Sequence, residues 1–271
     1  LIDIAYKEIE VAGRTCYKSE ENMTPDSAIS FVNKMIKSGH GAMLEHGTIY
    51  LKCPNYRSND TLARKDKYRD NKYSKFIMTS SECYITTNLR LLVENNWLDD
   101  LQYICEPTEY HEKRITVRFI MDRIGSQSFV RHRVFSFAQE STRYCNYSKD
   151  KFGNELTFII PNWSRLNESS HNIEWNGLYG VTEIDFSDDE TSIWFWALSV
   201  AERDYFKLIK KGWSPQQARS VLPNSLKTEL VMTGFISDWE HFFTLRCDKS
   251  AHPQARELAI PLSEDIKKLL K

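Results

Sequence analysis

Apolar residues recur every three or four positions in two long stretches of the chain, which is the pattern of an amphipathic helix. The first stretch follows Thr24 and Pro25, a pair that suits the start of a helix, and it ends at Gly39. We expect Thr24 to be the N-cap of this helix. The second stretch covers residues 188–211 and ends at Gly212, which predicts a long helix there as well.

Four shorter stretches are rich in β-branched and apolar residues, and we expect them to form strands. They are residues 48–51, 115–121, 156–160 and 228–233. Asp122 follows the second of them directly. Its carboxylate can accept a hydrogen bond from a free backbone N–H, so Asp122 is expected to cap a short helix.

Two segments have the residue order of a capping box, in which a serine and a glutamine or glutamate three positions later satisfy backbone N–H groups at the start of a helix. One runs from Ser214 to Gln217. The other runs from Ser237 to Glu240, and its helix is expected to reach about Arg246.

These elements together predict an α/β (α+β) fold, with a mostly antiparallel central sheet flanked by helices. We expect residues 1–271 to form a single domain with a surface insertion at about residues 52–113. No linker rich in proline, glycine and serine bounds that stretch, so a separate domain is not expected there.

Composition narrows the class of protein. The 271 residues are 41% apolar and 27% charged with a net charge of −1, which fits a globular protein and gives no overall positive field for nucleic acid. No apolar run is long enough to cross a bilayer and no signal peptide is recognisable, so we expect a cytoplasmic protein with no membrane partner. The six cysteines are scattered, and we expect them to be reduced.

Charge is dense in residues 64–75, where Tyr68 and Tyr73 lie between lysines and arginines. Such a run favours a solvated face or a mobile loop. The same mixture of basic and aromatic residues also occurs at sites for single-stranded nucleic acid.

The residues with the most unusual chemistry lie in segment 127–147, which reads QSFVRHRVFSFAQESTRYCNY. It carries Arg131, His132, Arg133 and Arg143 close together. Their positive charges would repel one another, so we expect an anion such as a phosphate or a carboxylate among them. No GxGxxG fingerprint occurs in the chain, which argues against a Rossmann-type dinucleotide site.

This segment resembles the signature of the flavin-dependent thymidylate synthases. The resemblance is carried by Arg131-His132-Arg133, by Ser141 after a gap of seven residues, and by Arg143-Tyr144 after that. Two further motifs of that family are resembled, in the same order, by residues 219–223 (RSVLP) and 244–246 (TLR). The resemblance covers roughly residues 12–51 and 114–260. It implies an enzyme that converts dUMP to dTMP, with methylenetetrahydrofolate as carbon donor and FAD and NADPH as the source of hydride. It also implies a homotetramer with shared active sites and no catalytic role for Cys145 or another thiol.

The resemblance implies a role for individual residues of this chain. Residues expected to bind dUMP are Ser128, Arg131, Gln139, Glu140, Ser141, Thr142, Arg143, Arg219 and Arg246. Residues expected to bind FAD are His46, Arg131, His132, Arg133, Val134, Gln139 and His241. Arg246 is the expected catalytic residue, because a guanidinium that stays protonated can stabilise negative charge on the uracil ring.

The chain departs from the family pattern at several positions. Gln139 stands where some members carry glutamate, and Ser128 replaces a longer polar residue. Phe235 and Ser237 replace polar groups of the flavin site. These positions leave the individual flavin contacts open.

Two other classes of function fit parts of the sequence. One is a protein that binds RNA or single-stranded nucleic acid through residues 131–143 and 64–75. The other is a metal-dependent hydrolase that uses His40, Glu45, His46 and His132. No HExxH helix pattern is present, so we expect hydrogen-bonded histidines and no metal site.

Overall fold

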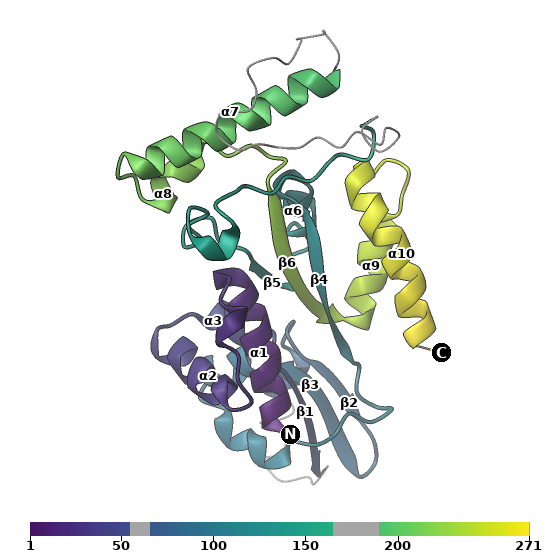
Figure 1. The fold of residues 1–271 in the computed structure, drawn as a ribbon. Coiled ribbons are helices and arrows are strands. Elements are labelled where there is room, and N and C mark those ends of the chain that lie inside the picture. The colour runs from purple at the N-terminus through teal and green to yellow at the C-terminus, as the bar shows by residue number, and fades with distance from the viewer. Residues whose placement is uncertain (55–65, 165–189, 271) are drawn as a thin grey trace. The chain divides into compact units, whose positions relative to one another are not determined.

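The computed structural model describes residues 1–54, 66–164 and 190–270, and these form two compact units (Figure 1). Unit 1 comprises Leu1–Phe119, Val130–Gln139 and Glu229–Leu245. Unit 2 comprises Ile120–Phe129, Glu140–Thr228 and Arg246–Lys271. The predicted single domain with an insertion stays a prediction.

Unit 1 contains a three-stranded sheet of β1 (Thr48–Pro54), β2 (Lys75–Met78) and β3 (Glu82–Asn88), in the order β1-β3-β2. Both pairs are antiparallel, and Leu51 lies opposite Ile85. The predicted strand at residues 48–51 is confirmed and extends to Pro54. The central strand β3 comes from the stretch predicted as an insertion, so part of that stretch belongs to the main sheet of unit 1.

Among the helices of unit 1 are α1 (Ile2–Tyr17), α2 (Ser27–Lys37), α3 (Gly41–Leu44) and α5 (Leu89–Glu94), with 3₁₀ turns at Glu20–Asn22 (η1) and Leu98–Tyr103 (η2). Helices α1 and α2 pack side by side (Figure 1). Ile9, Val32, Leu44 and Ile49 are fully or almost fully buried in the core between helices and sheet.

Helix α2 begins later than its sequence predicts. Its N-cap position is Asp26, and Thr24 lies before the helix in a turn. The Ser27 hydroxyl accepts a hydrogen bond from the backbone N–H of Thr24 at 2.9 Å, which ties the two residues together outside the helix. The predicted end is confirmed, because Gly39 has a φ of 71°, in the left-handed region that glycine favours.

The charged segment 64–75 is not simply a solvated face; its first two residues lie outside the described part. Tyr68 is fully buried, and its hydroxyl donates to the Asp100 carboxylate at 2.8 Å. Lys67 forms an ion pair with the same carboxylate at 2.6 Å and lies 4.6 Å from the centroid of the Trp97 ring. Two residues of this run therefore anchor it to unit 1.

The second sheet has the order β4-β6-β5, with β4 at Arg114–Asp122, β5 at Ser136–Gln139 and β6 at Lys227–Phe235. Strands β5 and β6 are antiparallel, with Ser136 opposite Thr233 and Gln139 opposite Leu230. The strands predicted at residues 115–121 and 228–233 are confirmed, whereas β5 was not predicted. The mostly antiparallel α/β architecture is confirmed, and it is divided between two small sheets.

Helix α9 (Ile236–Arg246) follows β6 directly and does not use the capping box expected at Ser237. The carboxylate of Asp238 accepts from the backbone N–H of Phe235 at 3.1 Å, so the stabilising contact starts two residues earlier. The N–H of Ser237 is taken by Glu112, at 3.0 Å. The predicted end near Arg246 is confirmed.

The helices of unit 2 are α6 (Arg123–Phe129), α7 (Glu190–Lys210), α8 (Pro215–Ala218) and α10 (Pro253–Leu269), with 3₁₀ turns at Asp150–Phe152 (η3) and Arg219–Val221 (η5). The cap at Asp122 is confirmed, because its Oδ1 accepts from the N–H of Gly125 at 2.7 Å. The capping box at Ser214 is confirmed as well. Helix α10 was not predicted; it packs on α6.

Two sequence predictions in unit 2 need correction. In α7, Leu198 and Tyr205 are buried as expected, but Ile193 is 61% exposed, so the predicted apolar side is buried only toward the C-terminal half. Residues 156–160 form one bridge, from Phe158 to Leu226, and no strand. Pro161 follows at once and has no N–H to extend such a ladder.

Candidate functional site

The loop of residues 140–147 in unit 2 holds four of the nine residues predicted to bind dUMP. The N–H groups of Tyr144 and Cys145 both donate to the carbonyl oxygen of Ser141, at 3.1 and 2.9 Å, so the loop folds back on itself. Thr142 and Cys145 are buried, while Arg143 and Tyr144 are exposed. The loop thus presents a guanidinium outward, as an anion site requires.

A second arginine approaches this loop from the turn that follows α8. Arg219 Nη1 donates to the hydroxyl of Thr142 at 3.4 Å, and Arg143 Nε donates to Gln216 Oε1 at 3.1 Å. Each segment thus donates one hydrogen bond to the other: the turn at Arg219 donates to the 140–147 loop, and the loop donates to Gln216 on α8. The exposed guanidinium groups of Arg143 and Arg219 are therefore brought to the same place, although the sequence separates them widely. Together they offer charged donors to a phosphate.

Arg246 and Ser128, both predicted at the nucleotide site, are in contact within unit 2. Arg246 Nη2 donates to the carbonyl oxygen of Ser128 at 2.7 Å. The Ser128 hydroxyl is engaged within α6, where it donates to the carbonyl oxygen of Gly125 at 2.7 Å. The end of α6 therefore holds the guanidinium of Arg246 in a fixed position.

The carboxylate of Glu140 lies behind the loop. It is 2% exposed, and its two oxygens accept from the Tyr147 hydroxyl and form an ion pair with Lys227, each at 3.0 Å. Burial, reinforced by the nearby Glu140 charge, raises the pKa of Tyr147 well above its ordinary value. Its hydroxyl thus stays protonated and keeps donating.

The residues predicted to bind FAD all belong to unit 1. His132 is 7% exposed, and its ring lies 5.0 Å from that of Phe242 and 6.1 Å from that of His241, between centroids. Arg131 and Arg133, on either side of His132, are both exposed, as are Val134 and His241. Two guanidinium groups thus face outward around a histidine that packs inward.

His46 lies in the core of unit 1. It has no exposed surface, and its Nδ1 is 2.8 Å from the hydroxyl of Thr233. Burial, with the Arg114 charge as the second cause, lowers the pKa of His46 to about 3. The imidazole is therefore neutral at physiological pH.

Arg114 is a structural centre of unit 1 that sequence reasoning missed. Its Nη1 donates to the carbonyl oxygen of Glu45 at 3.0 Å and lies 3.4 Å from the Thr48 hydroxyl, and its Nη2 donates to the Ser136 hydroxyl at 3.2 Å. It links β4 to the segment before β1 and to β5, which begins three residues after Arg133. Its position directly before the strand predicted at residues 115–121 gave no signal of this role.

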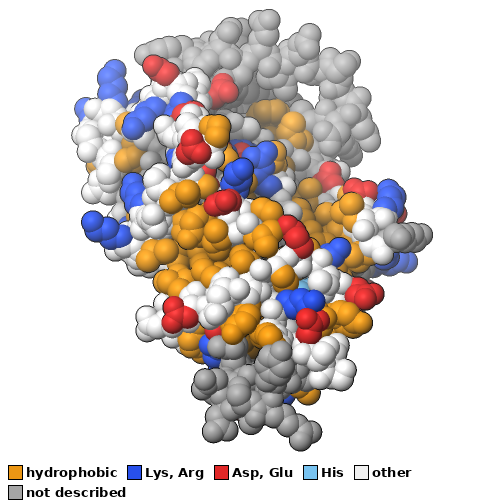
Figure 2. Space-filling view, turned by 90° about the horizontal axis from the view of Figure 1, so that it is seen from below, with side chains coloured by type: hydrophobic (Ala, Val, Ile, Leu, Met, Phe, Trp, Pro, Cys, Tyr) orange, Lys and Arg blue, Asp and Glu red, His pale blue; other side chains and the backbone are white. Residues whose placement is uncertain are grey.

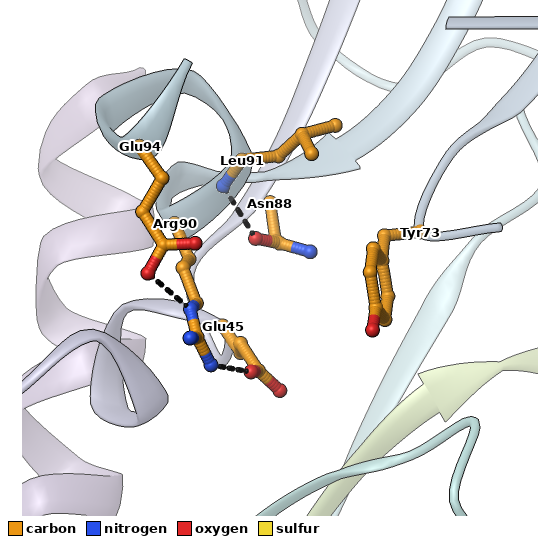
Figure 3. Close-up of a pocket in the computed structure, with 6 residues that line it drawn as sticks. All are labelled: Glu45, Tyr73, Asn88, Arg90, Leu91 and Glu94. Atoms are coloured by element: carbon orange, nitrogen blue, oxygen red, sulfur yellow. Dashed lines mark hydrogen bonds and ion pairs between the residues drawn. The ribbon is translucent and has the colours of Figure 1, made fainter. Parts of the chain in front are cut away.

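A pocket of about 120 Å³ lies in unit 1 (Figure 3). Its lining residues are Glu45, Tyr73, Asn88, Arg90, Leu91 and Glu94. Arg90 joins the carboxylates of Glu45 and Glu94, at 2.5 and 2.7 Å, and the side-chain oxygen of Asn88 accepts from the N–H of Leu91 at 3.1 Å. The charged residues that line this pocket are thus paired with one another. One of them, Glu45, is also a candidate residue of the metal-dependent hydrolase considered from the sequence.

The residues proposed for a metal-dependent hydrolase have separate partners. His40 is 3.0 Å from the Tyr17 hydroxyl, Glu45 pairs with Arg90, and His46 contacts Thr233. Across the described ranges, no group of three or more histidine, cysteine or acidic residues is arranged to hold a metal ion. The hydrolase hypothesis therefore lacks the ligand cluster that it requires in this part of the chain. The helices described here also include none long and apolar enough to span a membrane.

The predicted dUMP residues divide between the units. Arg131 and Gln139 belong to unit 1, and the others belong to unit 2. Within unit 2, the structure brings the 140–147 loop together with Arg219, and Arg246 together with Ser128.

Comparisons with known proteins found relatives that share one name. A flavin-dependent thymidylate synthase of Corynebacterium aurimucosum is 24% identical over 255 residues, which cover 93% of this chain and 72% of that protein. Similar proteins of the same name come from Pyrococcus horikoshii, 32% identical over 146 residues, and Synechocystis, 25% identical over 147 residues. Each of these two matches covers 54% of this chain. They cover 51% of the Pyrococcus protein and 62% of the Synechocystis protein. The chain thus spans about half the length of the Pyrococcus relative.

The family model described as thymidylate synthase complementing protein matches residues 107–270, which is more than half of the chain. The matched range includes the 127–147 segment, the turn at Arg219 and the end of α9. The chain therefore belongs to the thymidylate synthase complementing protein family.

Proposed function

We propose that this protein catalyses the reductive methylation of dUMP to dTMP. Methylenetetrahydrofolate would donate the carbon and become tetrahydrofolate, and FAD with NADPH would supply the hydride. The observation that carries the proposal is the pairing of Arg143 and Arg219 through the reciprocal contacts with Gln216 and Thr142. The family and the names of the relatives in Corynebacterium and Pyrococcus support it.

The nucleotide would be held by its phosphate and by its base. Arg143 and Arg219, with the hydroxyl of Ser141, suit a phosphate, because charged donors form short and strong bonds to its oxygens. Arg246 suits the uracil ring. Its guanidinium stays protonated, and its contact with the carbonyl oxygen of Ser128 holds it in place to stabilise charge that develops on the ring. Ser128 and Thr142 complete the proposed set in unit 2, while Arg131 and Gln139 of unit 1 stay predictions as dUMP ligands.

The residues of unit 1 fit a flavin. The exposed pair Arg131 and Arg133 suits a diphosphate group, and the packing of His132 against Phe242 fixes the backbone between them. Val134, Gln139 and His241 would contact other parts of the same group. His46 has no exposed surface and stays in this set as a prediction only. Bound FAD would contribute the redox chemistry, and the protein would orient the reactants.

A homotetramer and a cytoplasmic location are part of the same proposal. Figure 2 shows hydrophobic side chains gathered over the middle of one face of the molecule. Several exposed apolar side chains belong to unit 1, among them Ile4 at 56%, Ile29 at 52% and Met78 at 49%. Exposed apolar groups of this kind are common where copies of a chain associate. None of the six cysteines is in a disulfide, as is usual in the cytoplasm.

The test combines a spectrum with an activity assay. Purified protein should show flavin absorption that shifts when dUMP is added, and it should form dTMP. Arg246→Ala should keep the flavin and lose dTMP formation by about a hundredfold or more, because the variant lacks charge stabilisation on the ring. Arg203→Ala is the matched control, since Arg203 lies on α7 and forms an ion pair with its neighbour Asp204 at 2.9 Å. Normal turnover in Arg246→Ala would refute the assigned role, and a colourless protein that binds no added FAD would refute the proposed function.

A further inference from the structure

The loop that carries Ser141 and Arg143 is closed at its base by its own end residues. Glu140 begins the loop and Tyr147 ends it, and the Tyr147 hydroxyl donates to Glu140 Oε1 at 3.0 Å. Both side chains are almost fully buried, at 2% and 6% exposed. Because this bond joins the first and last residues, it fixes the path of the residues between them.

Lys227, the first residue of β6, completes the arrangement. Its ammonium lies 3.0 Å from Glu140 Oε2, and its side chain is 20% exposed. A buried carboxylate without a positive partner lowers the stability of the folded state. The carboxylate of Glu140 also lies next to Ser141 in the sequence. An uncompensated negative charge so close to a phosphate site would repel the phosphate. Lys227 thus both stabilises the buried carboxylate and cancels its charge.

Glu140 itself has no free oxygen to offer a ligand. Each of its two carboxylate oxygens already has a partner, and the side chain is buried behind the turn that presents Arg143 outward. Its place in the sequence motif therefore does not require that it touch the nucleotide.

Building on the proposed function, we propose that Glu140, Tyr147 and Lys227 form a buried triad of positioning residues that fixes the 140–147 loop for binding the phosphate of dUMP. The triad acts from behind the loop and makes no contact with dUMP. This gives Glu140, predicted above as a direct dUMP ligand, a different role in the same site.

The first test uses the flavin-loaded full chain and measures the dissociation constant of dUMP by calorimetry. Tyr147→Phe should raise that constant about tenfold, because one hydrogen bond to a charged group is lost. Flavin affinity, read from the absorption spectrum, should change less than twofold. Tyr205→Phe is the matched control, since Tyr205 is buried in the same apolar cluster and its hydroxyl donates no hydrogen bond to a described residue. The control should bind dUMP like the wild type.

The second test separates charge from packing. Lys227→Met should weaken dUMP binding by more than tenfold, because the carboxylate is left without its positive partner. Adding Glu140→Gln to that variant should restore part of the affinity, since it removes the repelling charge. A merely structural role predicts no such rescue.

The outcomes are distinct. Wild-type protein that does not bind dUMP would refute the proposed function together with this inference. If the wild type binds dUMP and the dissociation constants of Tyr147→Phe, Tyr205→Phe and the wild type are equal, the triad alone is refuted. Equal losses of dUMP and flavin affinity, with no rescue by Glu140→Gln, would also overturn it. If Lys227→Met does not fold, the dissociation constant of dUMP for Tyr147→Phe still tests the triad.

Discussion

Arg114 gives the sharpest prediction for the stability of unit 1. Its guanidinium makes two bonds within 3.2 Å, to the carbonyl oxygen of Glu45 and the hydroxyl of Ser136, and a longer contact of 3.4 Å to Thr48. Burial lowers the pKa of Arg114 to about 10, which leaves it charged at neutral pH. Arg114→Lys keeps the positive charge and removes the planar set of donors that reaches these groups together.

The size of the effect follows from the number of bonds lost. An ammonium can replace about one of the three contacts, and a hydrogen bond to a charged group contributes about 1.5–3 kcal/mol. Because one contact is long and the side chain is half-buried, we expect a loss of about 2–3 kcal/mol in the free energy of unfolding. The control is Arg118→Lys on the same strand, where the side chain is 53% exposed and 3.7 Å from Glu229. That variant should lose less than about 0.5 kcal/mol.

The assay is urea denaturation at pH 7, with the midpoint and the slope fitted separately. Hydrogen exchange should also become faster in residues 45–48 of Arg114→Lys, because the bond to Glu45 holds that segment. Equal stabilities for the Arg114→Lys and Arg118→Lys variants would refute the reasoning. So would a loss of stability with unchanged exchange in residues 45–48.

Two further predictions concern single contacts. Asp122→Ala should lower the free energy of unfolding by about 1–2 kcal/mol, because the N–H of Gly125 loses its acceptor. Asp122→Asn keeps an acceptor oxygen and should retain most of that stability. Equal losses in the two variants would argue against the cap. His46 has a folded-state pKa of about 3, below its ordinary 6.5, so as the pH falls from 6.5 the unfolded state takes up a proton that the folded state does not. Stability should therefore fall by about 2 kcal/mol between pH 6.5 and pH 5 through this group. His46→Gln should lose that part of the pH dependence and the exposed His252→Gln should keep it, and parallel slopes in all three proteins would contradict the shift.

Short-range patterns predicted the elements of the fold better than their ends. Asp122 was identified from its position alone, since an N-cap needs only its own helix. The caps expected at Thr24 and Ser237 were wrong because other local contacts compete, from Ser27 in one case and Asp238 in the other. Rules for helix ends thus identify candidate residues but do not choose between neighbours with the same chemistry.

Contacts between distant residues were not visible in the sequence. Glu140 and Lys227 lie 87 positions apart, and nothing near either residue indicates the other. Tyr68 and Asp100 are another such pair, and their contact turned a segment read as solvated into one that is partly buried. Strand β5 was missed for a related reason, because its four residues are defined by pairing with β6 and lie inside a segment dominated by its arginines.

The signature segment combines two kinds of residue, and exposure separates them. Arg131, Arg133 and Arg143 are exposed and can reach an anion, whereas His132 and Glu140 are buried and hold the backbone that carries them. A sequence motif records both kinds alike, since a binding loop needs its exposed groups and also the buried ones that hold its backbone. Exposure, which depends on distant partners such as Phe242 and Lys227, decides which motif residues can touch a phosphate. Variants of the buried residues should therefore be judged by ligand affinity together with the order of the loop, and those of the exposed arginines by affinity alone.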